Sequence, residues 1–179
     1  NAAATSAKNI IYLAGGETTS GASDHFYRLD LDKINEGWKQ LPSLPHPVSH
    51  TVLTVSENNN EQSVFLLGGR KKNTTEISKF YNSLFEFNIL KNQWKEKASL
   101  PYGLSAGTGI ADGKGNVLLF GGDKGETFHK VEEKLIAINV EKDELKKQEL
   151  TRQKNQLQSN HPGFSKEILQ YNTATDKWE

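Results

Sequence analysis

Cysteine and methionine are both absent from the sequence. Without cysteine there are no disulfides, no thiolate metal sites and no cysteine nucleophile. Lys and Arg together number 22, as do Asp and Glu, so the chain lacks the excess positive charge with which nucleic-acid-binding proteins contact phosphates. No apolar run approaches the ~20 residues of a membrane-spanning helix. Hydrophobic residues make up 35% of the chain, which is enough for the core of one folded domain over residues 1–179.

A motif of apolar residues, a Gly pair and a charged residue occurs three times. Exactly 53 residues separate one Gly pair from the next, both times, and the pairs are Gly15-Gly16, Gly68-Gly69 and Gly121-Gly122. Each pair is followed by an alternating segment that ends in Asp30, Asn88 or Asn172, and then by Trp38, Trp94 or Trp178. Alternation of polar and apolar residues predicts a half-buried strand, and each repeat accommodates four such short strands.

Four strands at a period near 50 residues are typical of a blade in a kelch-type β-propeller. The sequence therefore predicts an all-β fold with three four-stranded blades, at approximately 1–47, 48–102 and 103–179. Propellers have four to eight blades, so we expect these three to form part of a six-bladed ring. The three Trp side chains are expected to pack between neighbouring blades.

The third repeat carries an insertion between its second and third strands. From Gly pair to Trp it spans 56 residues, against 22 and 25 in the first two repeats. The inserted segment, approximately 127–158, is rich in Glu, Lys, Leu and Gln and contains no Gly or Pro, which predicts one or two helices ending near 160–163. Helix is expected nowhere else. Loops on one face of a propeller commonly form its binding site, so the insertion is a candidate lid.

The second and third repeats resemble the bacterial N-acetylneuraminate (sialic acid) mutarotase family, whose members are kelch propellers. The similar stretches are GGRKKN at 68–73, FYNSL at 80–84, NILKNQW at 88–94 and the helical insertion. The segment NHPGFSKEIL at 160–169 also resembles the cyclically permuted mutarotases. The resemblance implies a sugar isomerase that uses no cofactor and is periplasmic or otherwise exported. The family's proposed catalytic Glu and Arg belong to a blade after the insertion and match no position here, so residues 1–179 alone are expected to be inactive.

Mutarotation of a 2-keto sugar acid requires one acid, one base and a cation for the substrate carboxylate, ideally arginine. Residues just after each Gly pair begin loops that open toward the propeller axis. The candidate substrate-binding residues are therefore Arg70 for the carboxylate, Glu17 and Asp123 as acids, Lys124, and His50 at the start of an innermost strand. Simpler roles also exist: a surface cation for Arg70, turn capping for the acids and strand packing for His50. The histidines share no metal-ligand spacing, so no metal is expected.

Two functions remain open at this point. The first is a sialic acid mutarotase, whose partner is a small-molecule sugar acid. The second is a non-catalytic kelch module whose loops bind a protein or a glycan. Propellers host many functions, so the fold alone does not decide between them. The helical insertion and the similar stretches favour the isomerase.

Overall fold

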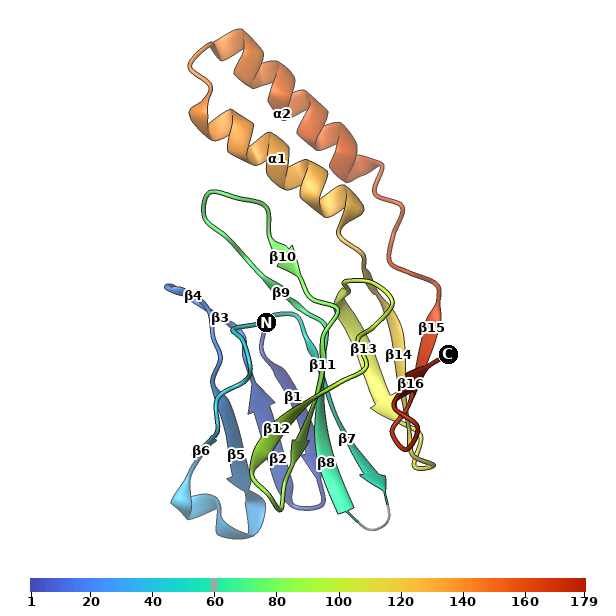
Figure 1. The fold of residues 1–179 in the computed structure, drawn as a ribbon. Coiled ribbons are helices and arrows are strands. Elements are labelled where there is room, and N and C mark those ends of the chain that lie inside the picture. The colour runs from blue at the N-terminus through green and yellow to red at the C-terminus, as the bar shows by residue number, and fades with distance from the viewer. Residues whose placement is uncertain (59–60) are drawn as a thin grey trace.

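A computed structural model describes residues 1–58 and 61–179 of the chain. Three antiparallel four-stranded sheets lie side by side, and a helical hairpin projects from one end of the third (Figure 1). The all-β architecture with a helical insertion is as predicted. Within the described part of the chain, the three sheets do not close into a ring.

Each sheet consists of four strands that follow one another along the chain. The first has the order β1 (Ala3–Ala7), β2 (Ile10–Ala14), β5 (Phe26–Asp30) and β6 (Lys39–Leu41). The second comprises β7 (Val52–Asn58), β8 (Glu61–Leu67), β11 (Leu84–Asn88) and β12 (Gln93–Lys97). The third comprises β13 (Ser105–Ala111), β14 (Asn116–Asp123), β15 (Ile168–Asn172) and β16 (Lys177–Trp178). The first strands β1, β7 and β13 lie next to one another and form the inner wall.

Two small hairpins follow the first two Gly pairs. They are β3 (Glu17–Thr18) with β4 (Gly21–Ala22), and β9 (Arg70–Lys71) with β10 (Lys79–Phe80). Both lie at the end of the sheets from which the helices project (Figure 1). The sequence predicts loops here, and the two hairpins fix the direction of the residues that follow the first two Gly pairs.

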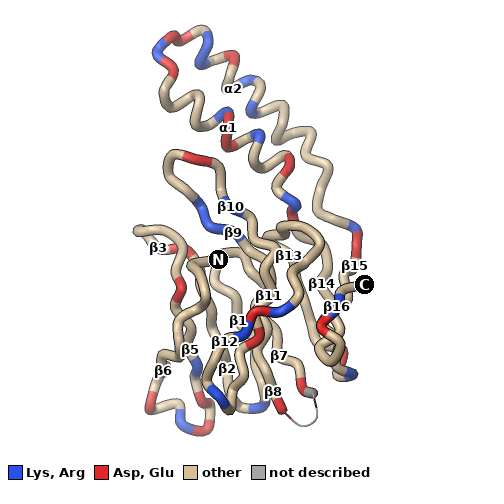
Figure 2. The backbone as a smooth tube through the Cα atoms, in the orientation of Figure 1, with Lys and Arg blue, Asp and Glu red and all other residues tan. Residues whose placement is uncertain are grey.

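The insertion forms two helices, α1 (Glu126–Val140) and α2 (Glu144–Ser159). Asp143 begins α2, since its side chain accepts hydrogen bonds from the backbone N–H groups of Leu145 and Lys146. Both helices carry residues of both charge signs (Figure 2). None of the described helices combines the length and apolar character that crossing a membrane requires.

Helix is not confined to the insertion, so that expectation is wrong. A short 3-10 helix, η1 (Leu31–Glu36), connects β5 to β6. Asp30, which ends β5, causes this turn because its carboxylate accepts a hydrogen bond from the N–H of Asp32. The sequence analysis assigned Asp30 a turn, and the structure extends that turn into a helix.

Two apolar cores lie between neighbouring sheets. Trp94 of the second sheet packs 5.1 Å from Phe26 of the first, and its indole N–H donates to the carbonyl of Pro42 at 3.2 Å. Trp178 repeats this arrangement one blade later and donates to Ala98 at 2.7 Å. Trp38 is 47% exposed, so its predicted packing between blades is wrong for this chain. Trp94 and Trp178, both half-buried, each contact the blade before their own, and the described residues include no blade before the first.

Candidate functional site

The largest hollow described at the helical end of the sheets lies between the small hairpins and α1. Its volume is about 530 Å³, which falls within the range of ligand-binding pockets. It is lined by Glu17, Arg70, Lys72, Thr127, Phe128, Val131, Glu132, Leu135, Gln158 and His161. The first three come from the segments after the Gly pairs and the others from the insertion. We call this hollow the Arg70 pocket.

Arg70 is the central cation of the pocket. Its position is fixed by the backbone, because Arg70 and Ser49 exchange two N–H···O hydrogen bonds of 2.8 Å. The side chain is only 15% exposed, and its guanidinium carbon lies 4.5 Å from the centre of the Phe128 ring. Its Nε is buried and has no hydrogen-bond partner among the described residues. A buried guanidinium N–H without a partner suits the binding of an anion.

Glu17 lies beside Arg70, with 3.7 Å between the Glu17 Oε1 and Arg70 Nη2 atoms. Its carboxylate also accepts hydrogen bonds from the Ser49 hydroxyl at 2.8 Å and the Asn1 amide at 2.9 Å. Partial burial acts to raise the pKa of Glu17, but the hydrogen bonds from Ser49 and Asn1 and the nearby cation outweigh it and hold the pKa below its usual range. The group is therefore ionised at neutral pH.

His50 joins this cluster through Ser49. Its Nδ1 lies 3.1 Å from the Ser49 hydroxyl and 3.9 Å from the Glu17 carboxylate. Desolvation, followed by the charge of Arg70, lowers the pKa of His50, so the imidazole is neutral at neutral pH. The residue has a positive φ of 52°, and its carbonyl accepts a hydrogen bond from the N–H of Ala106 on the third sheet.

Asp123 and Lys124 lie farther along the same end of the sheets. Asp123 accepts a hydrogen bond of 2.7 Å from the N–H of Gly125 and so shapes the turn that begins α1. Its other oxygen is 3.7 Å from His161, which also lines the Arg70 pocket. Lys124 instead pairs with Glu167 at 2.9 Å and covers the ring of Tyr102. The structure thus brings Arg70, Glu17 and His50 together and places the other two candidates in an adjacent hollow.

The sequence analysis did not identify the residues by which the insertion contacts the site. Glu132 of α1 accepts hydrogen bonds from the N–H and the hydroxyl of Ser78, at 2.8 and 2.6 Å, and so attaches the helix to the small β9–β10 hairpin. Phe128, Val131 and Leu135 form the apolar wall of the pocket. Their spacing of three, then four, residues places them on one face of a helix, but nothing in the sequence shows which face contacts the sheets.

We expect Glu17→Gln to change the acid stability of the protein. A depressed folded-state pKa stabilises the fold above the unfolded pKa of about 4.3, and this stabilisation is lost as the pH falls through the folded value. The variant lacks it, so its melting temperature should fall less between about pH 6 and about pH 3. Glu61→Gln, which removes an exposed acid, is the control. Equal acid dependence of Glu17→Gln and the natural protein would contradict the assigned contacts.

In the described part of the chain, no three His, Asp or Glu side chains are placed to share a metal ion. The Arg70 pocket combines a partly desolvated guanidinium, the ionised carboxylate of Glu17 and an apolar helix face. The neutral imidazole of His50 lies next to Glu17, outside the lining of the pocket. Such a set suits a small ligand that carries a carboxylate, hydroxyl groups and an apolar substituent.

Comparisons with known proteins agree with this picture. The family model described as N-acetylneuraminate epimerase matches residues 1–179. The N-acetylneuraminate epimerase of Haemophilus influenzae (strain PittEE) is 26% identical over 161 residues, which are 87% of this chain and 40% of that protein. Kelch-like protein 40a of Danio rerio is 30% identical over 119 residues, or 64% of this chain and 18% of that protein.

A solved structure titled "Structure of YjhT" has the same fold. Its TM-score is 0.75 at 18% identity, over 99% of this chain and 49% of that one. The chain thus spans less than half the length of this structure and of the curated epimerase it matches. The repeat pattern, the three sheets and these similarities together show a kelch-type β-propeller. Because the family model matches all of residues 1–179, the chain belongs to the N-acetylneuraminate epimerase family.

Proposed function

We propose that the whole protein is a sugar isomerase that interconverts the anomers of N-acetylneuraminate, and that the Arg70 pocket binds the sugar's carboxylate. Membership of the family supports a sugar-processing function. The observation that carries the role of the pocket is the Arg70 guanidinium, which is 15% exposed and has a buried Nε without a described partner. A carboxylate in the pocket would supply that partner.

The surrounding groups would orient the sugar. Phe128 stacks on the guanidinium and fixes its plane, so a bidentate carboxylate contact restricts the position of the neighbouring anomeric carbon. The ionised Glu17 would accept hydrogen bonds from sugar hydroxyls. His50 stays neutral near it and can exchange a proton through Ser49, although we assign no catalytic step to it.

We infer that ring opening is catalysed by groups outside residues 1–179. The reaction needs an acid that protonates the ring oxygen and a base that takes the anomeric hydroxyl proton, without metal or cofactor. The resemblance assigns these roles to a Glu and an Arg in a later blade. We further propose a ring of six blades, of which this chain supplies three, and export of the protein to the periplasm.

A non-catalytic kelch module that binds a protein or glycan is the second candidate, and the similarity to Kelch-like protein 40a favours it. The two functions differ in turnover. An isomerase accelerates an exchange at substoichiometric concentration, whereas a binding module leaves the exchange rate unchanged.

We expect the whole protein to accelerate anomer exchange of N-acetylneuraminate. The measurement is proton NMR on freshly released α-anomer, which follows the growth of the β-anomer signals with and without the protein. Residues 1–179 alone, at the same concentration, should leave the uncatalysed rate unchanged. An uncatalysed rate with the whole folded protein would overturn the isomerase proposal and favour the binding module.

A further inference from the structure

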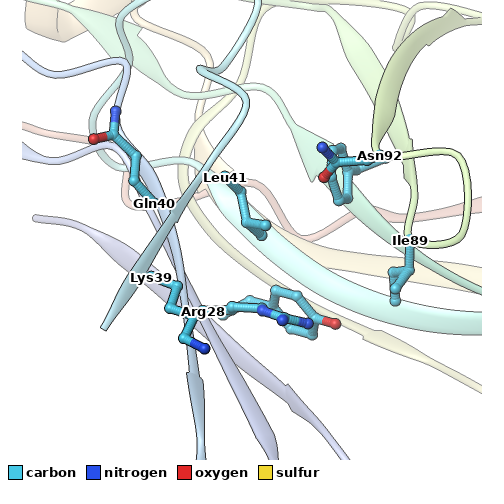
Figure 3. A pocket seen from close by; sticks show the side chains of 8 residues that line it. Arg28, Lys39, Gln40, Leu41, Ile89 and Asn92 are labelled. Carbon is cyan, nitrogen blue, oxygen red and sulfur yellow. The ribbon is translucent and has the colours of Figure 1, made fainter. Parts of the chain in front are cut away.

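A second hollow lies between the first and second sheets and shares no lining residue with the Arg70 pocket. Its volume is about 320 Å³. The lining residues from the first sheet are Tyr12, Arg28, Lys39, Gln40 and Leu41, and those from the second are Phe87, Ile89 and Asn92. Arg28 and Leu41 extend into the gap, opposite Ile89 and Asn92 from the second sheet (Figure 3). The residues that line both sides of the hollow all belong to this chain.

The internal repeat provides a reference for this hollow, because the second and third sheets pack in the same way. Arg28 pairs with Tyr12 across β5 and β2, and Glu86 pairs with Phe65 across β11 and β8. Glu86 of the second sheet is therefore the counterpart of Arg28. Asn92 precedes Trp94 by the same number of residues as Asp176 precedes Trp178, so these two positions correspond. By the same count from the Trp, Phe87 corresponds to Tyr171.

At the interface between the second and third sheets, the polar groups contact one another. The ammonium of Lys97 lies 3.5 Å from the carboxylate of Glu86 and 4.0 Å from that of Asp176. Asp176 also accepts hydrogen bonds from the Tyr171 hydroxyl at 2.7 Å and the N–H of Ala98 at 2.8 Å. Two carboxylates thus supply partners for the cation, the phenol and the backbone N–H.

At the interface between the first and second sheets, both carboxylates are missing. Arg28 occupies the place of Glu86, and Asn92 that of Asp176. Leu41 takes the place of Lys97. Leu41 is the strand partner of Phe26 in the first sheet, and Lys97 is the strand partner of Leu84 at the same position in the second. This interface therefore has a cation, Arg28, where the other has an acid, and an apolar side chain, Leu41, where the other has a cation.

Three polar side chains that line this hollow have hydrogen-bond donors without a described protein acceptor. Tyr12 is only 3% exposed, and its hydroxyl makes no hydrogen bond to any described residue. The same is true of the Arg28 guanidinium and the Asn92 side-chain amide within the described ranges. Burial raises the pKa of Tyr12, so its hydroxyl stays protonated and able to donate.

The acid closest in sequence to this wall is already occupied. Glu36 of η1 pairs with the ammonium of Lys39, and it does not line the hollow. Among the described residues, Lys39 of the lining thus has an ion-pair partner and Arg28 has none. A ligand of this hollow must therefore bring one negative charge and hydrogen-bond acceptors.

We propose that this hollow is a binding site for a small organic monocarboxylate, which supplies the negative charge that Glu86 and Asp176 supply one blade later. Its carboxylate accepts hydrogen bonds from the Arg28 guanidinium and the Tyr12 hydroxyl. Its apolar part lies against Leu41, Phe87 and Ile89. The volume lies at the lower end of ligand pockets, which fits a ligand the size of benzoate or isobutyrate.

The test uses benzoate, isobutyrate and inorganic phosphate as probes of the whole protein, in ¹H–¹⁵N NMR titrations. Benzoate and isobutyrate should shift the backbone signals of 39–41 and 89–92 in a saturable way. Arg28→Gln should weaken this binding at least tenfold, because it removes the lining cation that has no ion-pair partner among the described residues. Tyr12→Phe should weaken it several-fold while leaving the ring in place.

Lys91→Gln is the matched control, since it removes a positive charge next to Asn92 from a residue that does not line the hollow. It should leave the affinity unchanged. Equal binding of Arg28→Gln and the natural protein, no saturable shift, or equal shifts with phosphate would each overturn the proposal. Because Arg70 is untouched in these variants, the result is independent of the proposed isomerase function.

Discussion

Arg70→Ala in the whole protein is expected to raise the KM for N-acetylneuraminate roughly 10- to 150-fold. A charge-assisted hydrogen bond of this kind contributes about 1.5–3 kcal/mol, and each 1.4 kcal/mol is a factor of ten in affinity. Arg70 is the arginine of the pocket lining, and its Nε has no hydrogen-bond partner among the described residues, so the substrate contact is lost without breaking a described hydrogen bond of that atom. The measurement is the concentration dependence of the anomer exchange rate.

The matched control is Lys71→Ala on the same short strand. Lys71 is exposed and does not line the pocket, so this variant loses a neighbouring positive charge without changing the site. Its KM should stay at the natural value. Arg70→Lys should recover part of the affinity, because an ammonium retains the charge but loses the planar pair of donors. An unchanged KM in Arg70→Ala would reduce Arg70 to a structural cation beside Glu17.

Gly68→Ala is expected to lower the free energy of unfolding by about 2–5 kcal/mol. Gly68 has a φ of 56°, and an added Cβ would lie 2.4 Å from the carbonyl oxygen of Leu104. That oxygen already accepts a 2.7 Å hydrogen bond from the N–H of Gly69. The substitution therefore combines left-handed backbone strain with a steric clash at the point where the second and third sheets meet. Urea unfolding measures the loss in the free energy of unfolding.

Gly113→Ala is the control for the strain alone. Gly113 has a φ of 72°, but no atom lies within 4 Å of an added Cβ. It should cost only about 1–2 kcal/mol. If both variants lost the same stability, the close approach of Leu104 to Gly68 would have no energetic consequence. The third Gly pair approaches its neighbours less closely at Gly121, where the nearest atom is 3.9 Å away.

The local pattern of the chain was sufficient to predict the strands and the inserted helices. Alternation of apolar and polar residues predicts a strand, and a segment without Gly or Pro that is rich in helix-forming residues predicts a helix. Both patterns involve only residues close together in the sequence. The insertion was predicted at 127–158, and α1 and α2 together occupy Glu126–Val140 and Glu144–Ser159. The packing of Trp38 was predicted wrongly because it depends on a neighbouring blade and not on its own repeat.

The composition of the site was decided by the tertiary structure. Four charged residues stand in similar positions after the Gly pairs, so the repeat alone treats them as equivalent. Glu17 and Arg70 are carried by small hairpins and face each other, whereas Lys124 lies beside the start of α1 and reaches Glu167 instead. Phe128 contacts Arg70 only because the start of α1 lies against the β9–β10 hairpin. The repeat thus determined where such residues occur, but their side-chain directions follow from contacts between segments far apart in the chain.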